Sequence, residues 1–449
     1  MFKPFHNIQR HGLRWLVTLI CFTFLSACSD DSTESGTSGY LQLYNASTNA
    51  PTLYLQVDDS VLAGSPYGDT SSYYEYDSGS YEVEVLWQDS DDSLESINTQ
   101  TITISGDQTQ LLVVTGDINQ PDVLTYNYGN ETLDDVFSLR FLNLTAQDNS
   151  SLDLYMSAGT DSFAEATLQG SFTVQALSDS FHYETDDYKF YITAAGSDVV
   201  LFETDAIEFP YNTKYIISIM PNTGPGESPY SLDRISQSST VLSFDDINSS
   251  GAYRLYNGLV NKSINTYIDT IDDTPEVAAL PTSGLSESHS LAYGDYSLNI
   301  TDAANDSVLL KNHLITLNAN NDKTIFVYDD TDDGLSTFML NNNKQISLYD
   351  HSVQIINFLP EYASLDLFFV RSSETIDTAE YRSLSNNFAT AKNIILPNST
   401  FDIFITVDQG ESRLLLLKES VTFDEDSGHL FLTIEEPTTG EYSLTLNKQ

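Results

Sequence analysis

The sequence predicts an all-β protein, a tandem array of four Ig-like β-sandwich domains that follows a signal peptide and a short flexible tether. One observation behind this prediction is composition, because 27 Tyr and 23 Phe together with frequent Ile, Val and Thr favour strands. The other is a recurring five-residue pattern (apolar, any residue, apolar, apolar, Asn), found at Leu41–Asn45, Leu139–Asn143, Tyr253–Asn257 and Val353–Asn357. The four asparagines lie 98, 114 and 100 residues apart, the length of one small domain.

Each of the four units continues with the same succession of segments that alternate with the period of two expected of strands. The second segments are Leu53–Val57, Leu152–Met156, Leu365–Phe369 and, as the poorest match, Ile264–Ile268. The third segments begin at an aromatic residue and are Tyr81–Val85, Tyr188–Ile192, Tyr296–Ile300 and Phe401–Ile405. Later strands include Leu111–Val114, Tyr215–Ile219, Thr324–Tyr328 and Leu430–Ile434. Six or seven strands in about 90 residues, separated by polar turns, are typical of a β-sandwich.

The turn before the third segment has its own features. Asp77–Tyr81 resembles a tyrosine corner, in which the phenol bonds back to the backbone near the turn. Gly79 and Gly294 precede the aromatic residue by two positions, and we expect them to permit a positive φ there. Because three more strand-like segments follow this corner, the prediction is Ig-like in architecture and not in topology.

The first 27 residues read as a secretory signal peptide, in which the apolar run Trp15–Leu25 is too short to span a bilayer as a mature helix. Its positive region consists of Lys3, Arg10 and Arg14. Leu25-Ser26-Ala27-Cys28 resembles the lipobox of bacterial lipoproteins, which implies cleavage before Cys28 and acylation of its thiol. The alternative is a small-residue cleavage site that precedes a cysteine by coincidence. Residues 28–39 then form an acylated Cys and a flexible, Gly/Ser-rich tether.

Two or three acyl chains hold a protein firmly at a membrane, so the resemblance implies stable anchoring without a transmembrane helix. In this class an Asp after the cysteine favours the inner membrane; Ser29 stands there instead, which implies the outer membrane if the cell is Gram-negative. Cys21 lies inside the signal, so the mature chain would have no disulfide. Each unit must therefore be stabilised by packing.

We expect β-sandwich 1 in residues 40–128, β-sandwich 2 in 136–235, β-sandwich 3 in 250–342 and β-sandwich 4 in 351–449. The junctions between them are short and polar, which favours beads in a row with limited bending. Val241–Phe244, within the second junction, is apolar and predicts an extra edge strand.

Removal of the signal would leave 15 basic and 65 acidic residues, a net charge near −50. Nucleic acid and anionic headgroups would be repelled, because binding them depends on Lys and Arg. The charge supports solubility and opposes self-association. We therefore expect no nucleic acid partner.

The first unit resembles a known bacterial family. Asn45-Ala46-Ser47, Ala50-Pro51, Leu53–Asp58 and the spacing Gly79, Tyr81, Val83, Val85 are similar to the domain of unknown function 4397 over about Tyr40 to Val114. Thr48-Asn49 and Ser78 depart from the family pattern, which has Pro-Asp and Ala there. The resemblance implies the fold and an exported, envelope-associated location, and it implies no catalytic residues.

Several residues are candidates for chemistry. Asn45, Asn143, Asn257 and Asn357 could contact a ligand, but we expect each side chain to bond backbone groups where its strand turns. Asp89–Asp92 and Asp329–Gly334 suggest calcium, yet aligning Gly334 to the sixth place of an EF-hand loop puts Leu340 at the twelfth, so the pattern fails. The five histidines outside the signal are far apart in sequence, and no metal site or cofactor is predicted; they are His182, His289, His313, His351 and His429.

The sequence contains no nucleophile elbow, Walker loop or dinucleotide fingerprint, so no catalytic residues are assigned. Arg371–Pro397 and Gly159–Asp187 are the longest irregular segments, and loops of this kind carry recognition in other sandwiches. Thr375–Leu384 could form a short helix.

The primary hypothesis is a lipid-anchored protein of the bacterial cell envelope, a non-catalytic structural or binding module that contacts a protein or glycan through loops or sheet edges. One alternative is an envelope enzyme or glycan-processing accessory with a loop-borne site. A second is a calcium-stiffened adhesin or spacer.

Overall fold

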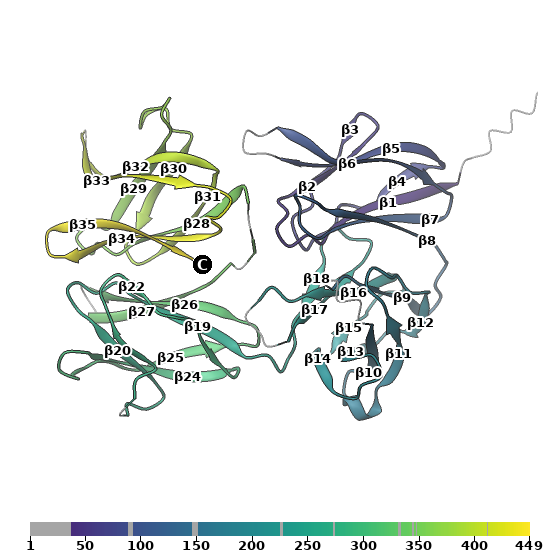
Figure 1. Ribbon diagram of the computed structural model, residues 1–449, viewed down its shortest axis with the longest axis horizontal. Helices are drawn as coiled ribbons and strands as arrows, with labels where there is room; N and C mark the ends of the chain where they lie inside the picture. Colours follow the sequence, from purple (N-terminus) through teal and green to yellow (C-terminus); the bar gives the residue numbers. More distant parts are fainter. Residues whose placement is uncertain are drawn as a thin grey trace, which may run out of the picture. The chain divides into compact units, whose positions relative to one another are not determined.

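The four units of the sequence fold into four β-sandwiches, each made of two sheets that pack face to face (Figure 1). The computed structural model describes residues 37–88, 93–145, 151–224, 228–272, 274–330, 334–343, 345–346, 348–410 and 412–449. The predicted signal peptide, Cys28 and the acidic run Asp89–Asp92 lie outside the described residues.

The first sandwich has sheets ordered β4-β1-β7-β8 and β3-β2-β5-β6. Its strands are β1 (Ser38–Asn45), β2 (Leu53–Val57), β3 (Ser60–Val61), β4 (Tyr74–Asp77), β5 (Gly79–Gln88), β6 (Leu94–Ile104), β7 (Gln108–Thr115) and β8 (Asp122–Gly129). In β2, Leu53, Leu55 and Val57 are buried while the intervening residues are half-buried, which is the predicted period of two.

The second sandwich has sheets ordered β12-β9-β16-β17-β18 and β11-β10-β13-β14, with β15 also on β13. Its strands are β9 (Val136–Asn143), β10 (Leu152–Ala158), β11 (Thr167–Phe172), β12 (Phe181–Glu184), β13 (Asp187–Ala194), β14 (Val200–Glu203), β15 (Ile207–Glu208), β16 (Lys214–Pro221), β17 (Tyr230–Ile235) and β18 (Leu242–Phe244). Strand β18 pairs with β17, so the predicted extra edge strand is confirmed.

The third sandwich has sheets ordered β22-β19-β26-β27, with β23 also on β19, and β21-β20-β24-β25. Its strands are β19 (Gly251–Asn257), β20 (Ile264–Ile268), β21 (Val277–Leu280), β22 (Gly284–Leu285), β23 (His289–Leu291), β24 (Gly294–Asp302), β25 (Val308–Leu317), β26 (Asp322–Asp330) and β27 (Gly334–Asn341).

The fourth sandwich has sheets ordered β31-β28-β34-β35 and β30-β29-β32-β33. Its strands are β28 (Asp350–Asn357), β29 (Ser364–Val370), β30 (Tyr381–Asn387), β31 (Ala391–Pro397), β32 (Ser399–Gln409), β33 (Ser412–Phe423), β34 (Leu430–Thr438) and β35 (Glu441–Lys448). The predicted helix over Thr375–Leu384 is wrong, because residues 375–378 form a turn and β30 begins at Tyr381.

All four sandwiches share one topology, in which the opening strand pairs in parallel with a strand near the end of its unit. These parallel pairs are β1 with β7, β9 with β16, β19 with β26 and β28 with β34. The remaining ladders are antiparallel, and the predicted fold class is confirmed. The first sandwich has eight strands instead of the predicted six or seven, because β3 and β4 are too short to show a periodic pattern.

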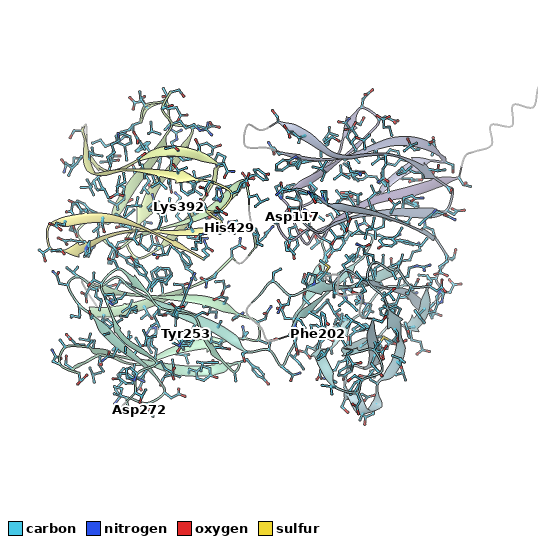
Figure 2. All side chains as sticks on the ribbon, in the orientation of Figure 1. Asp117, Phe202, Tyr253, Asp272, Lys392 and His429 are labelled. Carbon is cyan, nitrogen blue, oxygen red and sulfur yellow. The ribbon has the colours of Figure 1, made fainter. Side chains whose placement is uncertain are left out.

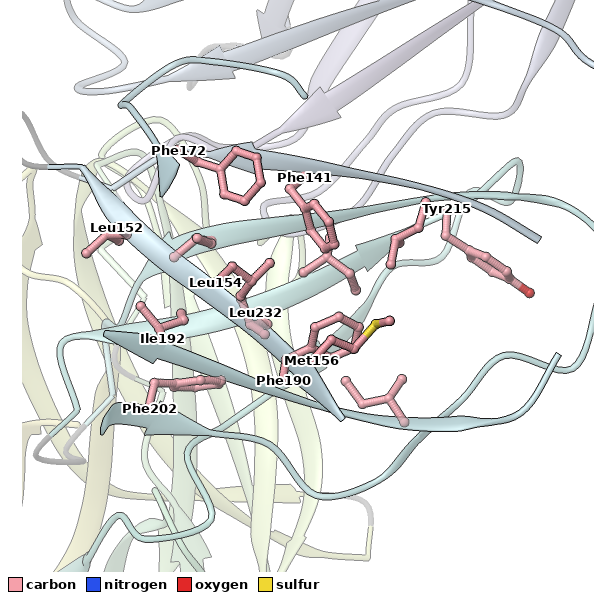
Figure 3. Close-up of a cluster of buried hydrophobic side chains, with 14 of the residues drawn as sticks. Phe141, Leu152, Leu154, Met156, Phe172, Phe190, Ile192, Phe202, Tyr215 and Leu232 are labelled. Carbon is pink, nitrogen blue, oxygen red and sulfur yellow. The ribbon is translucent and has the colours of Figure 1, made fainter. Parts of the chain in front are cut away.

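Each sandwich encloses its own apolar core. In the second, Phe141, Phe172 and Phe190 converge between the sheets with Leu154 and Ile192 (Figure 3). Tyr253, labelled in Figure 2, is fully buried in the core of the third sandwich. Burying such a side chain stabilises the fold by about 1.5–3 kcal/mol. The described residues contain no Cys, so packing of this kind stabilises each sandwich.

The tyrosine corner is confirmed and recurs in three sandwiches. The hydroxyl of Tyr81 donates to the Asp77 carbonyl at 2.9 Å, that of Tyr188 to Glu184 at 2.8 Å and that of Tyr296 to Ala292 at 2.6 Å. Phe401 has the same place in the fourth sandwich, where a ring without a hydroxyl packs into the core.

The expectation that Gly79 and Gly294 adopt a positive φ is wrong. Neither is among the residues with positive φ, because each is the first residue of an extended strand. A Cβ on Gly79 would lie 3.4 Å from the Tyr81 ring, and one on Gly294 would lie 3.6 Å from the Tyr296 ring. In both turns, therefore, the tyrosine ring of the corner lies against the glycine.

The expectation of beads in a row is also wrong for two of the three junctions. The second sandwich packs against the first, and the fourth against the third, each through an apolar cluster drawn from both partners. Residues 37–449 accordingly form one compact unit. Within the described residues, the structure has no helix long and apolar enough to cross a membrane.

Candidate functional site

The contacts between sandwiches are built by the sheets that contain the opening strands. We call the contact of sandwiches 1 and 2 the first seam and that of sandwiches 3 and 4 the second seam. The first seam buries Tyr44, Ala46, Leu111, Val113, Leu142, Leu144, Ile216, Met220, Ile235 and Val241. The second seam buries Tyr256, Phe326, Tyr328, Ile356, Phe358 and Phe431. These strands are covered on both faces, one by the core of their own sandwich and the other by the seam.

A tyrosine donates to a buried carboxylate in each seam. In the first, the Tyr44 hydroxyl donates to Asp233 of β17, whose other oxygen accepts from the Ser243 hydroxyl at 2.6 Å. In the second, the Tyr256 hydroxyl donates to Glu435 of β34 at 2.7 Å. Tyr44 and Tyr256 hold equivalent positions, since each precedes the recurring Asn. Both seams therefore combine an apolar contact with one buried hydrogen bond from a tyrosine to a carboxylate. We call the Tyr44–Asp233 and Tyr256–Glu435 bonds the polar locks of the two seams.

Burial shifts the titration of these groups. Desolvation raises the pKa of the Asp233 carboxyl to about 6, although the hydrogen bonds from Ser243 and Tyr44 act in the opposite direction. Burial also raises the pKa of the Tyr44 phenol and that of the Glu435 carboxyl. Perturbed pKa values often mark active sites. Here the side chains are sealed, because Tyr44 is 0% exposed, Asp233 5% and Glu435 2%.

The junction after sandwich 2 adds polar contacts to the first seam. Gln42, on β1, donates to the carbonyls of Ser236 at 3.1 Å and Ser238 at 3.0 Å. The Thr70 hydroxyl donates to the same Ser238 carbonyl at 2.7 Å. The segment predicted as a polar junction is thus held along sandwich 1.

One end of the first seam is open and forms a cleft of about 390 Å³. Ala46 and Leu144, both buried, are apolar residues of its wall. Its polar lining includes the hydroxyl residues Thr48, Thr115 and Thr145 together with Asp122 and Gln175. The Gln175 amide donates to the Asp122 carboxylate at 3.2 Å, so these two side chains join the sandwiches across the cleft.

The second seam is filled in the corresponding place. The ladders align Asn45 with Val114 and Asn257 with Val327, so that Thr115 of the first seam corresponds to Tyr328 of the second. By the same reasoning, Leu144 corresponds to Phe358. The rings of Tyr328 and Phe358 stack with centroids 5.9 Å apart, and Phe388 lies edge-on to Tyr328 at 5.8 Å. Smaller residues therefore leave the cleft in the first seam where aromatic rings close the second.

The four recurring asparagines are structural, as expected. Each is fully buried and donates from Nδ2 to backbone carbonyls: Asn45 to Pro51 and Ser65, Asn143 to Phe172, Asn257 to Lys262 and Leu280, and Asn357 to Tyr362 and Asn386. In the last three, Oδ1 also accepts from the backbone amide two residues on. These side chains hold the turn after each opening strand and none is available to a ligand.

The histidines form no metal site in the part of the chain that the structure describes, where no three His, Cys, Asp or Glu side chains are placed to hold an ion. His351, on β28, and His429, directly before β34, are distant in sequence and come together where these strands pair. The His351 ring bonds the Gly428 carbonyl at 2.9 Å and Asn398 at 2.7 Å, and His429 Nδ1 accepts from the Ser352 amide at 2.9 Å. His182 contacts Glu131 at 3.0 Å.

The acidic run Asp329–Gly334 joins β26 to β27 in a hairpin, and residues 331–333 lie outside the described residues. The Asp330 and Gly334 backbones pair directly across that hairpin. The described residues of the run, Asp329, Asp330 and Gly334, therefore belong to the paired strands.

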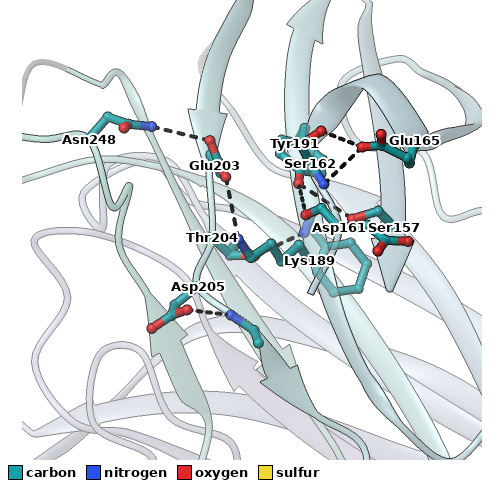
Figure 4. A network of polar contacts seen from close by, with 12 residues as sticks. Ser157, Asp161, Ser162, Glu165, Lys189, Tyr191, Glu203, Thr204, Asp205 and Asn248 are labelled. Carbon is teal, nitrogen blue, oxygen red and sulfur yellow. Dashed lines mark hydrogen bonds and ion pairs between the residues drawn. The ribbon is translucent and has the colours of Figure 1, made fainter. Parts of the chain in front are cut away.

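The two long segments predicted as loops are largely regular. Gly159–Asp187 contains β11 and β12 and one 3₁₀ turn, Phe163–Glu165, in which the Ser162 amide donates to Glu165 at 3.1 Å (Figure 4). The Tyr191 hydroxyl holds this turn by donating to the Asp161 carbonyl at 3.1 Å (Figure 4). Arg371–Pro397 contains β30 and β31, and its first part covers the apolar pair Phe368 and Val370.

Neither the two seams nor the cleft was predicted from the sequence. A signal was present, because Leu111–Val114 and Tyr215–Ile219 are nearly continuous apolar runs, the pattern of strands buried on both faces. The identity of the covering surface is not encoded in such a run.

Comparison with known families bears on the first sandwich. Residues 39–155 match the family model of the domain of unknown function DUF4397. The match covers all of sandwich 1 and the first strands of sandwich 2, so the resemblance inferred from the first unit is confirmed. A comparison with curated proteins gives no match.

Solved structures show distant similarity at 11% sequence identity. The Bacillus anthracis TIE protein covers 88% of this chain over 67% of its own, with a TM-score of 0.15. A candidate cell adhesion protein of Bacteroides fragilis covers 44% over 86% of its own, and the major pilin subunit of Bacillus cereus 67% over 99%, both with a TM-score of 0.13. At such TM-scores these similarities carry no conclusion about fold or function.

Proposed function

We propose that this protein is a lipid-anchored, non-catalytic structural or binding module of the bacterial cell envelope, with a protein or glycan as its partner. Acylated Cys28 would hold it at the outer membrane, and residues 29–39 would tether the first sandwich there. The acidic surface would keep it soluble and away from anionic headgroups.

The observation that carries the non-catalytic part of this proposal is the enclosure of the buried titratable groups between the sandwiches. Asp233 and Glu435, which have the raised pKa values expected of catalytic acids, are enclosed between sheets and bonded to tyrosines. A substrate has no access to side chains that are 5% and 2% exposed. Their arrangement supports a role in joining sandwiches and gives no support to catalysis by these groups.

The anchoring part of the proposal is tested by Cys28→Ser in the native cell. The variant removes the only thiol that lipid could modify in the mature chain, so the protein should move from the membrane fraction to the soluble fraction and lose incorporated radiolabelled palmitate. Cys21→Ser is the matched control, since that cysteine lies in the predicted signal and its loss should leave both readouts unchanged. Continued membrane association of the Cys28→Ser protein would refute the anchor.

A further inference from the structure

The cleft of the first seam lies where two contacts of the same topology differ in the size of their residues. Both seams use the same strands of the same topology, and both carry a Tyr–carboxylate lock. At the cleft, Thr115 and Leu144 occupy the positions that Tyr328 and Phe358 hold in the second seam. The seam interior follows the same trend, since Val113 and Ile216 correspond to Phe326 and Phe431. Since aromatic residues at the two cleft positions are compatible with the fold, the space of about 390 Å³ is not imposed by the architecture.

The two seams also differ in polarity at the position of Gln175, which lines the cleft. The backbone amides of Gln175 and Ala389 both donate to the recurring Asn of their sandwich, at 2.7 and 2.8 Å, which makes the two residues equivalent. Both have a positive φ, 60° and 51°. The second seam thus has a methyl group where the first has a carboxamide, and in the first that carboxamide contacts Asp122.

The polar groups of the cleft suit a ligand rich in hydroxyl groups. The Thr48 and Thr115 hydroxyls can donate and accept, whereas the Thr145 hydroxyl donates to Asn143 Oδ1 at 2.7 Å and can only accept. The Gln175 amide does both, and the Asp122 carboxylate accepts hydrogen bonds. Leu144, Ala46 and Pro221 supply apolar surface for the carbon atoms of the ligand. The volume lies within the range of about 300–1,000 Å³ found for small-molecule sites.

Charge selects against an anionic ligand. The chain has no Lys or Arg between Arg14 and Arg140, which includes the whole of sandwich 1, and the residues that line the cleft include none. Its single charged side chain, Asp122, is anionic and already hydrogen-bonded to Gln175. A neutral ligand is not repelled by this carboxylate and can donate hydrogen bonds to it.

We propose that the cleft of the first seam is a binding site for a neutral saccharide, one or two sugar residues at the end of a glycan. The inference rests on the proposed role as a binding module and names its partner. Asp122 and Gln175 accept and donate to adjacent sugar hydroxyls, Thr48, Thr115 and Thr145 bond the others, and Leu144 packs on the C–H face of the ring. The second seam, closed by Tyr328 and Phe358, takes no ligand and serves only to join its sandwiches.

The test is saturation-transfer difference NMR and isothermal titration calorimetry on the purified full chain in detergent. The probes are glucose, galactose, mannose, N-acetylglucosamine and their disaccharides. At least one should bind, and Thr115→Tyr, Leu144→Phe and Asp122→Ala should each weaken that binding at least tenfold. Thr115→Tyr and Leu144→Phe install the residues of the second seam, while Asp122→Ala changes an exposed side chain, so that loss of fold and loss of binding are separable by thermal melting.

Thr101→Tyr is the matched control, the same substitution at an exposed residue of β6, and it should leave sugar binding unchanged. Absence of binding by every sugar, or binding that survives all three cleft variants, would overturn the inference. Binding of spermidine in an Asp122-dependent manner without any sugar would also overturn it, because the ligand class would be cationic. The Cys28→Ser chain should still bind the sugar, which distinguishes failure of this site from failure of the anchor.

Discussion

At the scale of single residues, the polar locks of the two seams decide how the sandwiches join. Tyr44 and Tyr256 directly precede the recurring asparagines, so their positions within the opening strands could be predicted from the sequence. The carboxylates that accept their hydrogen bonds could not be predicted. Asp233 is 189 residues from Tyr44, and no local pattern connects a tyrosine to one of 65 acidic residues. The asparagines were predictable because their bonds are to the turn that directly follows or to backbone of the same unit.

The Asp233 lock makes the first seam sensitive to pH. Burial raises the pKa of Asp233 in the folded chain to about 6, above the ordinary value of 3.8, so between these values the folded state binds more protons than the unfolded state. The contribution of this group to stability is therefore present below pH 4 and is lost as pH rises to 6, by about 3 kcal/mol at most.

Asp233→Asn removes that titration and keeps a side chain that can bond Tyr44. The difference in melting temperature between the variant and the wild type should be small at pH 4 and should favour the variant at pH 7. Full-chain calorimetry at both pH values measures it, and the comparison cancels the repulsion among the other acidic residues. An identical pH dependence in both proteins would mean that Asp233 is not the titrating group.

At the scale of elements, the strand pattern could be read from the sequence and the sheet contacts could not. The alternating apolar residues of β2, and those of β5 from Tyr81 onward, mark the inward faces of these strands. The apolar run Val241–Phe244 predicted β18. Short strands such as β3 (Ser60–Val61) are set by tertiary pairing with β2 and have no periodicity to detect. The apolar outer faces of β7 and β26 were visible only as uninterrupted apolar runs, which do not name the surface that covers them.

The seam face of β26 should therefore carry as much energy as a core. Phe326 is fully buried and lies 5.1 Å from the ring of Phe431, across the second seam. Phe326→Ala should cost about 3–5 kcal/mol of unfolding free energy, as for a large ring removed from a core. Leu314→Ala on β25, a residue 63% exposed, should change it by less than about 0.5 kcal/mol.

Urea unfolding of the full chain, monitored by far-UV circular dichroism, measures the unfolding free energy of both variants. Equal, small effects of Phe326→Ala and Leu314→Ala would show that the second seam contributes nothing to stability.

At the scale of the whole molecule, one fold has been repeated four times and the copies are joined in two pairs. The repeat and its length were evident from four asparagines, since each copy needs the same turn. The pairing was not, because the short polar junctions favoured beads in a row with limited bending. In the structure, the segment after sandwich 2 is bonded to Gln42 and Thr70 of sandwich 1. The strongly acidic surface accompanies this architecture without disrupting it, because the seams are apolar and their carboxylates are buried with partners.

The joining of sandwiches 1 and 2 through the first seam is the central claim, and hydrogen–deuterium exchange on Ile216→Asp tests it most directly. Ile216 belongs to the seam cluster, while its neighbours Tyr215 and Ile217 belong to the core of sandwich 2, so the charge enters the seam alone. The account predicts faster exchange in β7 of sandwich 1 and unchanged exchange in β26 of sandwich 3. Unchanged exchange in β7 would contradict it.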